Sequence, residues 1–150
     1  MTRQPTFADQ ALQLDHQLCF ALYSASLAMT KLYKPLLDSL QLTYPQYLVM
    51  LVLWEDDGLT VSALGERLHL DSGTLTPLLK RLETVGWIER QRSTEDERRV
   101  HVALTDAGRA LKVRAAAIPG CVVKATGCSL PDLMSLTRQV KDLRDRIAPA

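Results

Sequence analysis

The sequence predicts a mainly α-helical fold with a small β-hairpin wing, arranged as a winged helix-turn-helix between long terminal helices. Three observations predict it. Residues 61–68 and 72–85 are two helix patterns joined by a short turn, which is the spacing of a helix-turn-helix. Two short strand patterns with a charged turn between them follow directly, at 87–92 and 98–104. Beyond this centre, apolar residues recur three or four positions apart over long segments at both ends.

The bulk composition is that of one ordinary globular domain spanning residues 1–150. Hydrophobic residues make up 47% of the chain and charged residues 23%, while the net charge is only +1. Any positive patch therefore has to be local. The longest apolar run, Tyr47 to Trp54, is far shorter than the roughly 20 residues that cross a bilayer, and the N-terminus lacks a signal-peptide pattern. We therefore expect a cytoplasmic protein without a membrane partner.

The N-terminal segment, residues 9–40, is predicted to form dimerisation helices. Apolar residues at three-four spacing predict a long helix over 9–33, which is longer than a small domain needs internally. Pro35 is expected to end this helix, because proline cannot join the helical hydrogen-bond ladder. It can also open a short second helix that runs to Leu40.

Residues 43–105 are predicted to form the winged-helix region. Thr43 and Gln46 make a capping box around a proline, which predicts the start of a strongly apolar, buried helix. Thr60 is the expected cap of the 61–68 helix, and Gly86 is the expected end of the 72–85 helix.

The C-terminal segment, residues 106–147, is predicted to form the second set of dimerisation helices. Thr105 should cap a long helix that continues past Pro119, and Ser129 should start the last helix. The apolar residues of that last helix form a narrow seam, the pattern for packing on another helix: Leu133, Leu136, Val140, Leu143 and Ile147. Since the terminal helices have little of their own domain to cover them, we expect a homodimer with intertwined ends. A monomer whose end helices fold over the centre is the alternative.

The predicted helix at 72–85 and the hairpin after it carry the residues expected to contact DNA. The start of the helix exposes backbone amides that suit a phosphate, and arginine suits both guanine edges and a narrow minor groove. The outward candidates on the helix and the arginines of the hairpin are Ser72, Thr74, Thr76, Lys80, Arg81, Arg90, Arg92, Arg98 and Arg99. Asp96 is a candidate internal partner for Arg98. Acidic residues in the hairpin offset the arginines, so a protein-binding winged helix with a solvated hairpin is the alternative.

The chain has three cysteines: Cys19, Cys121 and Cys128. An odd number in a reducing compartment argues against a structural disulfide framework. A free thiol has a pKa of about 8.5, so a thiol sensor needs its thiolate stabilised. Tyrosine hydroxyls could donate hydrogen bonds to a thiolate at Cys19, and the candidates are Tyr23, Tyr33 and Tyr44. An inert thiol in an apolar helix is the plainer interpretation. The cysteines and histidines lack metal-ligand spacing, so no zinc site and no cofactor are expected.

Two stretches of the sequence resemble a known family. Residues 93–99 (STEDERR) and 104–108 (LTDAG) resemble the wing signature of the MarR family of dimeric transcription regulators. Residues 70–82 are similar to the organic hydroperoxide-sensing (OhrR-like) branch of that family. The resemblance implies a homodimer on a pseudo-palindromic operator, with one recognition helix per half-site. It further implies DNA contacts for five residues: Asp71, Ser72, Thr74 and Arg81 in the major groove and Arg98 in the minor groove.

The same resemblance implies the roles of the cysteines and tyrosines. Cys19 would be the peroxide-reactive thiol, and Tyr33 and Tyr44 would reach it from the partner chain. A second cysteine would then capture the oxidised thiol in a disulfide between the two chains. Cys121 is slightly favoured over Cys128 for this role, and a small-thiol cap on Cys19 is the alternative.

The sequence and the resemblance together predict a DNA-binding transcriptional repressor and not an enzyme. It would release its operator when an organic hydroperoxide oxidises the reactive cysteine. An apolar pocket around the thiol is expected to favour organic over inorganic peroxides, with a lining of Phe20, Leu22, Met50 and Leu53. Two alternatives stay open: a MarR-type repressor released by a phenolic ligand, and a thiol peroxidase.

Overall fold

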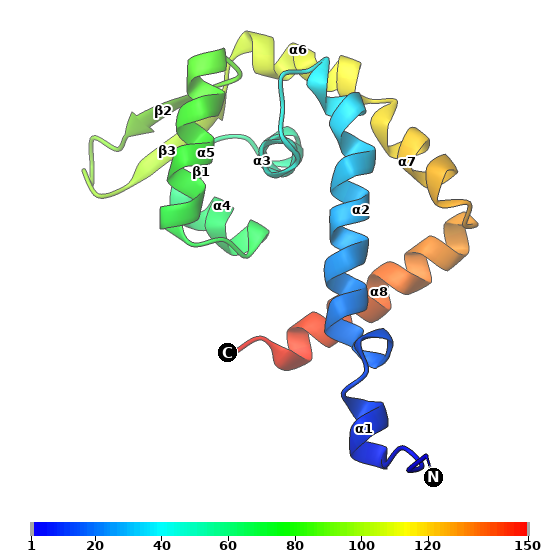
Figure 1. Ribbon diagram of the computed structural model, residues 1–150. Helices are drawn as coiled ribbons and strands as arrows, with labels where there is room; N and C mark the ends of the chain where they lie inside the picture. The colour runs from blue at the N-terminus through cyan, green and yellow to red at the C-terminus, as the bar shows by residue number, and fades with distance from the viewer. Residues whose placement is uncertain (1, 150) are drawn as a thin grey trace.

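The computed structural model describes residues 2–149 and shows a mainly helical chain with a small three-stranded sheet at one side (Figure 1). The helices are α1 (Phe7–Ala11), α2 (Leu18–Asp38), α3 (Tyr44–Glu55), α4 (Val61–Leu68), α5 (Ser72–Val85), α6 (Asp106–Ala115), α7 (Ile118–Thr126) and α8 (Leu130–Ile147). A 3₁₀ turn, η1, covers Leu14–His16. The strands β1 (Leu59–Thr60), β2 (Ile88–Arg92) and β3 (Val100–Leu104) form an antiparallel sheet in the order β1-β3-β2. The predicted fold class, mainly α with a β-hairpin wing, is confirmed.

The winged-helix region, from α3 to β3, forms a head with its own core. Leucines at three-four spacing on α4 and α5 point to one side, and Leu64, Leu75, Leu79 and Leu82 are fully buried there. Both predicted caps of α3 and α4 are present, since Thr43 and Gln46 exchange capping bonds and the Thr60 hydroxyl accepts the N–H of Ala63 at 3.1 Å. The two-residue strand β1, which the sequence did not suggest, pairs with β3 and completes the sheet.

The N-terminal segment differs from the prediction of one helix over 9–33. The chain leaves the helical path after α1, and the side-chain amide of Gln17 donates to the carbonyls of Ala11 and Gln13 at 2.6 and 2.8 Å. These bonds satisfy carbonyls that a continuous helix would have used. The expectation that Pro35 ends the next helix is also wrong, because α2 runs through it to Asp38. Pro35 falls in the last turn, where a missing N–H removes only one helical bond.

The C-terminal segment is broken where a continuous helix was expected. Helix α6 ends at Ala115 and α7 starts at Ile118. Pro119 stands in the first turn of α7, where it has no N–H to donate to the carbonyl of Ala115. The break redirects the chain so that Ile118 and Val122 reach the core and α7 contacts α2. Within the described chain, α8 contributes no buried residue.

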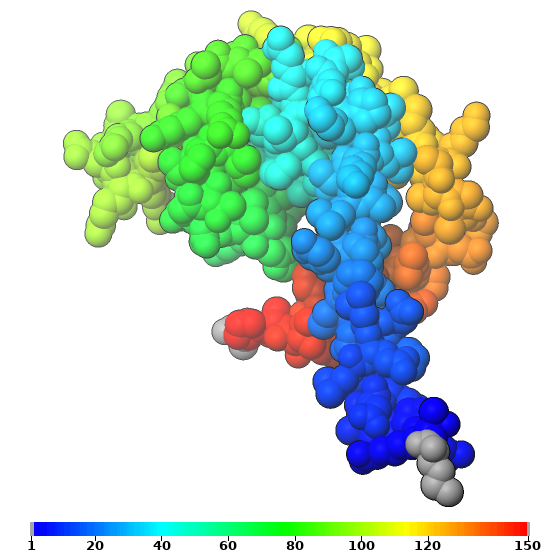
Figure 2. Space-filling view, in the orientation of Figure 1, coloured from blue at the N-terminus to red at the C-terminus, as the bar shows by residue number. Residues whose placement is uncertain are grey.

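The end segments leave much apolar surface uncovered. Figure 2 shows the N-terminal segment projecting away from the head. The chain exposes 11,004 Å², whereas a compact monomer of this mass exposes about 7,600 Å². The large exposed apolar side chains of the end segments are Phe7, Leu12, Leu14, Leu18, Phe20, Tyr23, Leu27, Met29, Val113, Leu130, Met134, Leu136, Val140 and Ile147. This exposure fits an extended subunit better than a finished monomer.

Between residues 2 and 149, no helix has the combination of length and apolarity that crossing a membrane requires.

Candidate functional site

A basic groove lies between α5 and the wing. It has a volume of about 880 Å³, and its lining includes Lys80, Arg90, Arg92, Arg98 and Arg99 together with hydroxyls from α4 and α5. Every charged side chain that lines it is positive. A chain with a net charge of +1 therefore carries a strongly positive local surface, as the sequence required of a DNA-binding protein.

The start of α5 is organised by Asp71. Its carboxylate accepts the backbone N–H of Thr74 at 2.7 Å, and this bond lowers the pKa of Asp71 below its ordinary value. One of the amides that the sequence suggested for a phosphate is therefore already bonded, and the cap itself is negative. The predicted DNA contacts Ser72 and Thr74 are exposed beside it, whereas Thr76 is half-buried in the groove.

The basic residues of α5 are exposed, whereas Arg90 of β2 is held in an ion pair. Lys80 and Arg81 are exposed and free to approach a ligand. Arg90 instead pairs with Glu83 of α5 at 3.1 Å, and its backbone N–H donates to the same carboxylate at 2.9 Å. The hydrogen bond from the Arg90 side chain is the main reason that the pKa of Glu83 lies below its ordinary value. Arg90 thus fastens the wing to α5, a role that the sequence did not reveal.

The wing tip holds its exposed arginine through a short acidic turn. The backbone N–H of Arg98 donates to Asp96 Oδ1 at 3.0 Å, and its Nε lies 3.4 Å from the same oxygen. The prediction that Asp96 is the internal partner of Arg98 is confirmed. The Arg98 side chain is still 92% exposed, so the pair orients the guanidinium without burying it. Strand β3 starts at Val100 rather than at Arg98. Arg98 therefore lies in the turn between β2 and β3 and is not part of the paired strand.

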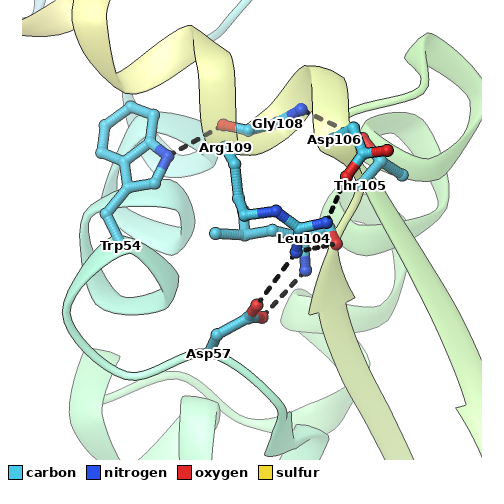
Figure 3. A network of polar contacts seen from close by, with 7 residues as sticks. All are labelled: Trp54, Asp57, Leu104, Thr105, Asp106, Gly108 and Arg109. Carbon is cyan, nitrogen blue, oxygen red and sulfur yellow. Dashed lines mark hydrogen bonds and ion pairs between the residues drawn. The ribbon is translucent and has the colours of Figure 1, made fainter.

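A network of polar contacts joins the head to α6 at the root of the wing (Figure 3). We call it the joint; its residues are Trp54, Asp57, Leu104, Thr105, Asp106, Gly108 and Arg109. The indole N–H of Trp54 donates to the carbonyl of Gly108 at 3.0 Å, and the N–H of Leu104 donates to Asp57 at 2.9 Å. Arg109 reaches back from α6 to the carbonyl of Leu104 at 3.2 Å and to Asp57 at 3.6 Å. The end of α3, the end of β3 and the start of α6 are thus tied at one place.

Close backbone packing reinforces the joint. The Thr105 hydroxyl caps α6 by accepting the N–H of Gly108 at 3.0 Å, and it donates to the carbonyl of Gly86 at 2.6 Å. A Cβ atom on Gly108 would stand 2.0 Å from the carbonyl oxygen of Trp87. Only glycine fits this contact, so α6 rests directly on the backbone at the start of the wing. The wing and α6 should therefore move as one body.

The reactive-cysteine candidate lies at the start of α2. Cys19 is the second residue of this helix and is exposed, whereas the sequence suggested a place midway along a longer helix. Tyr23 follows one turn later on α2 and is 63% exposed. His16, in η1, makes a 2.7 Å contact to the carbonyl of Gln10 through Nδ1. Within one chain, Cys19 and Tyr23 thus lie on an open surface rather than in a pocket.

The remaining tyrosines form a cluster at the far end of α2. Tyr33 of α2 packs on Tyr44 and Tyr47 of α3, with ring centroids 4.8 and 5.7 Å away. Burial, and then the neighbouring tyrosines, raise the pKa of Tyr33 to about 12, so the hydroxyl stays protonated and can donate. The sequence analysis missed Tyr47, although its spacing of three from Tyr44 on a helix was a usable signal.

One chain cannot bring this cluster to its own Cys19. Fourteen residues of α2 separate Cys19 from Tyr33, which at helical rise is about 21 Å. The predicted roles of Tyr33 and Tyr44 therefore require a second chain, in agreement with the sequence analysis.

The predicted apolar pocket around the thiol is only half present. Phe20 is 38% exposed next to Cys19, and Leu22 is half-buried. Met50 and Leu53, at 0% and 1% exposure, belong to the core of the head and cannot line a pocket. Their inclusion was wrong because the apolar run of α3 faces the core on nearly all sides.

The two C-terminal cysteines do not share one helix. Cys121 lies on α7, which ends at Thr126 and is capped by Gly127 with a φ of 68°. Cys128 lies in the turn between this cap and α8. Both thiols are exposed. Across residues 2–149, no group of three or more metal-ligating side chains comes together.

Comparisons with known proteins agree with this geometry. A family model described as "Transcriptional regulator SarA/Rot" matches residues 31–114. The chain is 55% identical over 125 residues to the "Organic hydroperoxide resistance transcriptional regulator" of Bacillus subtilis (strain 168), which covers 83% of this chain and 85% of the relative. That relative is a transcriptional regulator and not an enzyme.

Two solved structures of one protein, AbfR of Staphylococcus epidermidis, are similar over most of both chains. The structure of reduced AbfR bound to DNA matches with a TM-score of 0.79 at 34% identity, covering 95% of this chain and 100% of the other. The structure of disulfide-formed AbfR matches with a TM-score of 0.63 at 35% identity, covering 93% and 98%. The present conformation is thus more similar to the reduced, DNA-bound form than to the disulfide form.

Proposed function

Because the chain belongs to the MarR family of winged-helix transcriptional regulators, in the branch of the organic hydroperoxide resistance regulators, we propose that it is a DNA-binding repressor whose operator is released by oxidation of Cys19. The regulator that it resembles rules out the thiol peroxidase alternative. Three parts of the proposal rest on different observations: the basic groove, the uncovered end helices and the divided thiol site.

The first part is DNA binding by the basic groove. Helix α5 would enter the major groove, with Ser72, Thr74 and Arg81 at base edges or phosphates. Arg98, held outward at the wing tip by Asp96, would enter the minor groove. Asp71 would contribute to DNA binding mainly by capping α5. Arg90 would contribute by holding the wing against α5.

The second part is a homodimer built from the end helices. Two such chains together expose about 6,800 Å² more than two compact monomers of their mass, which is more than the roughly 2,000–5,000 Å² that stable homodimers bury in total. The narrow seam on α8 and the exposed apolar face of the N-terminal segment provide the surface. A two-fold dimer would hold two heads at a fixed separation, which a pseudo-palindromic operator requires.

The third part is the thiol site, and one observation carries it: Cys19 and the tyrosine cluster lie at opposite ends of α2 and are both incomplete. If two α2 helices cross antiparallel about a two-fold axis, each thiol meets the tyrosines of the other chain. Two hydroxyls donating to a thiolate would contribute about 1.5–3 kcal/mol each. Exposed Phe20 and half-buried Leu22, covered by the second chain, would give the site its preference for organic hydroperoxides.

The chemistry follows in two steps. The Cys19 thiolate attacks one oxygen of an organic hydroperoxide, so that an S–O bond forms, the O–O bond breaks, and the alkoxide leaves as an alcohol after taking a proton. A resolving thiolate then attacks the sulfenic sulfur, forming a disulfide while the hydroxide leaves as water. Closure of that disulfide would draw α2 against the C-terminal helices and change the separation of the two heads.

A gel shift on the chain's own promoter tests the proposal. Reduced wild-type protein should bind the duplex, and cumene hydroperoxide should release it. Cys19→Ser protein should bind equally well and stay bound in the presence of the peroxide. Release of the Cys19→Ser protein by the same dose would show that another group senses the oxidant.

The resolving cysteine is tested separately on non-reducing gels after peroxide treatment. We propose Cys121, so Cys121→Ser should abolish the dimer-sized band and Cys128→Ser should keep it. Loss of the band in Cys128→Ser but not in Cys121→Ser would assign the resolving role to Cys128. Absence of a dimer-sized band in the wild type as well as in both variants would indicate a small-thiol cap on Cys19.

A further inference from the structure

Tyr47 is the one member of the tyrosine cluster to which the proposed mechanism gives no part. Its ring centroid lies 5.7 Å from that of Tyr33 and 6.4 Å from that of Tyr44. It is also the most buried of the three, with 3% of its surface exposed, whereas the other two are half-buried. Tyr47 is thus the buried ring against which the other two rings pack.

We propose that Tyr47 is a positioning residue of the thiol site, and that its ring sets the angle at which Tyr33 and Tyr44 present their hydroxyls to the partner's Cys19. The inference rests on the proposed function and deepens it. It assigns a specific task to a residue that would otherwise count as core.

The helix geometry carries the first step. Tyr44 is the first residue of α3 and Tyr47 the fourth, so both side chains emerge on the same face of the helix. The capping box of Thr43 and Gln46 fixes this first turn, with the Thr43 N–H donating to Gln46 at 2.9 Å. Tyr44 alone could swing at the helix end, but the Tyr47 ring blocks one side of it.

The packing between α2 and α3 carries the second step. Tyr33 comes from α2 and lies over both α3 tyrosines, with interplanar angles of 47° to Tyr44 and 42° to Tyr47. Tilted pairs at these separations are favourable aromatic contacts, each worth about 0.5–1.5 kcal/mol beyond area burial. Tyr33 therefore has two contacts that fix its ring plane, and removal of the Tyr47 ring would remove one of them.

The state of the hydroxyls carries the third step. Among the residues that the structure describes, no side-chain hydrogen bond involves Tyr33, Tyr44 or Tyr47, so the donors are not used within the chain. Burial raises the pKa of all three, so their hydroxyls stay protonated, and the ring centroids lie between 4.8 and 6.4 Å apart. Tyr33 and Tyr44 thus offer two neutral donors to one acceptor, and an anionic sulfur is such an acceptor.

The test compares four variants in a Cys121→Ser/Cys128→Ser background, so that Cys19 is the only thiol. Tyr47→Leu removes the ring, Tyr47→Phe keeps the ring and loses only the hydroxyl, and Tyr33→Phe removes a proposed donor. Leu53→Ala is the matched core control, since Leu53 is 1% exposed on the same helix but lies outside the cluster. Each variant is checked for operator binding in the reduced state and for thermal unfolding.

The measurements are the rate of Cys19 oxidation by cumene hydroperoxide and the rate of its alkylation by iodoacetamide from pH 5 to 9. We expect Tyr47→Leu to slow oxidation at neutral pH about tenfold, the size of one lost hydrogen bond to a charged group. Its alkylation profile should move to higher pH, as that of Tyr33→Phe should. Tyr47→Phe should rescue both readouts to within about twofold of the parent, and Leu53→Ala should lower only the thermal stability.

The results distinguish the proposed thiol site from the positioning role of Tyr47. If Tyr33→Phe moves the pH profile and Tyr47→Leu does not, the positioning role is wrong while the thiol site stands. If neither variant moves it, both the thiol site and the inference fall. Equal slowing by Tyr47→Leu and Leu53→Ala would reduce Tyr47 to an ordinary core residue.

Discussion

The head and the end segments use the same apolar spacing and reach opposite outcomes. In the head, the apolar stripes of α4 and α5 close on each other, and Leu64, Leu75, Leu79 and Leu82 are fully buried. Helix α8 has an equally regular stripe, yet none of its residues is buried in the described chain. A regular stripe therefore predicts that a surface will be covered, but it does not say by which chain.

Polar contacts show the same contrast. The joint links residues far apart in the sequence, such as Trp54 with Gly108 and Asp57 with Leu104. In α8, the side-chain hydrogen bonds of the described residues stay within one helical turn. The head is thus a structure that one chain can complete, whereas α8 is ordered by local bonds and left for another chain to cover.

The strongest way to break the head is to open the joint. Gly108→Ala should destabilise the protein by more than about 3 kcal/mol, the upper part of the range for overpacking, because the new Cβ meets a backbone oxygen of Trp87 that cannot move aside. Urea unfolding measures the loss. Gly120→Ala is the matched control, since its Cβ would meet no atom within 4 Å, and a loss as large as that of Gly108→Ala would contradict the role of the joint.

A pair of leucine truncations sharpens the comparison. Leu79→Ala, in the core of the head, should lower the free energy of unfolding by about 3 kcal/mol at any protein concentration. Leu136→Ala, on a residue that is 54% exposed in one chain, should instead weaken the dimer. Its effect on unfolding should depend on protein concentration. Sedimentation and unfolding at two concentrations check both, and a concentration-independent effect of Leu136→Ala would argue for a monomer.

A smaller effect is expected from one hydrogen bond of the joint. Trp54→Phe keeps most of the ring but loses the donor to the Gly108 carbonyl. The expected loss is about 1 kcal/mol of unfolding free energy, together with faster amide exchange at the start of α6. Unchanged exchange there, measured against α8 as an internal reference, would mean that the bond does not couple α3 to α6.

The smallest expected effect is a pH dependence at the boundary between the two regions. Burial raises the pKa of Tyr33 from 10.0 to about 12, so the folded chain holds this proton more tightly than the unfolded chain. The stabilisation is complete below pH 10 and is lost as the pH rises toward 12. Urea unfolding at pH 9 and 11 should show the loss, and Tyr33→Phe should reduce it. An equal loss in the variant would assign it to other groups.

Sequence patterns predicted the head well because its signals are local. Caps at Thr43, Thr60 and Thr105, the stop at Gly86 and the turn of Asp96 depend on neighbours within a few residues. Helix boundaries in the end segments were less predictable. Whether Pro35 ends a helix depends on what packs beside it, and the break before Pro119 depends on the core that Ile118 enters.

The site was predictable in composition but not in arrangement. Residue types and the resemblance identified Cys19, Tyr33 and Tyr44, and the structure gathers only the two tyrosines. Two features depend on contacts between elements, which no local pattern specifies. They are the pairing of Arg90 with Glu83 and the packing of Tyr47 against Tyr33. Met50 and Leu53 were misassigned for the same reason, since both face the core of the head.

The separation of Cys19 from Tyr33 along α2 has a genetic consequence. If each thiol is completed by the other subunit, an allele with Cys19→Ser and an allele with Tyr33→Phe and Tyr44→Phe damage different halves of the same site. A heterozygous cell then makes mixed dimers in which one site has lost both halves while the other is fully wild-type. The mixed dimers alone would then respond to peroxide, although the homodimers of each allele stay on the operator, whereas a site built within one subunit would leave the mixed dimers as insensitive as either parent.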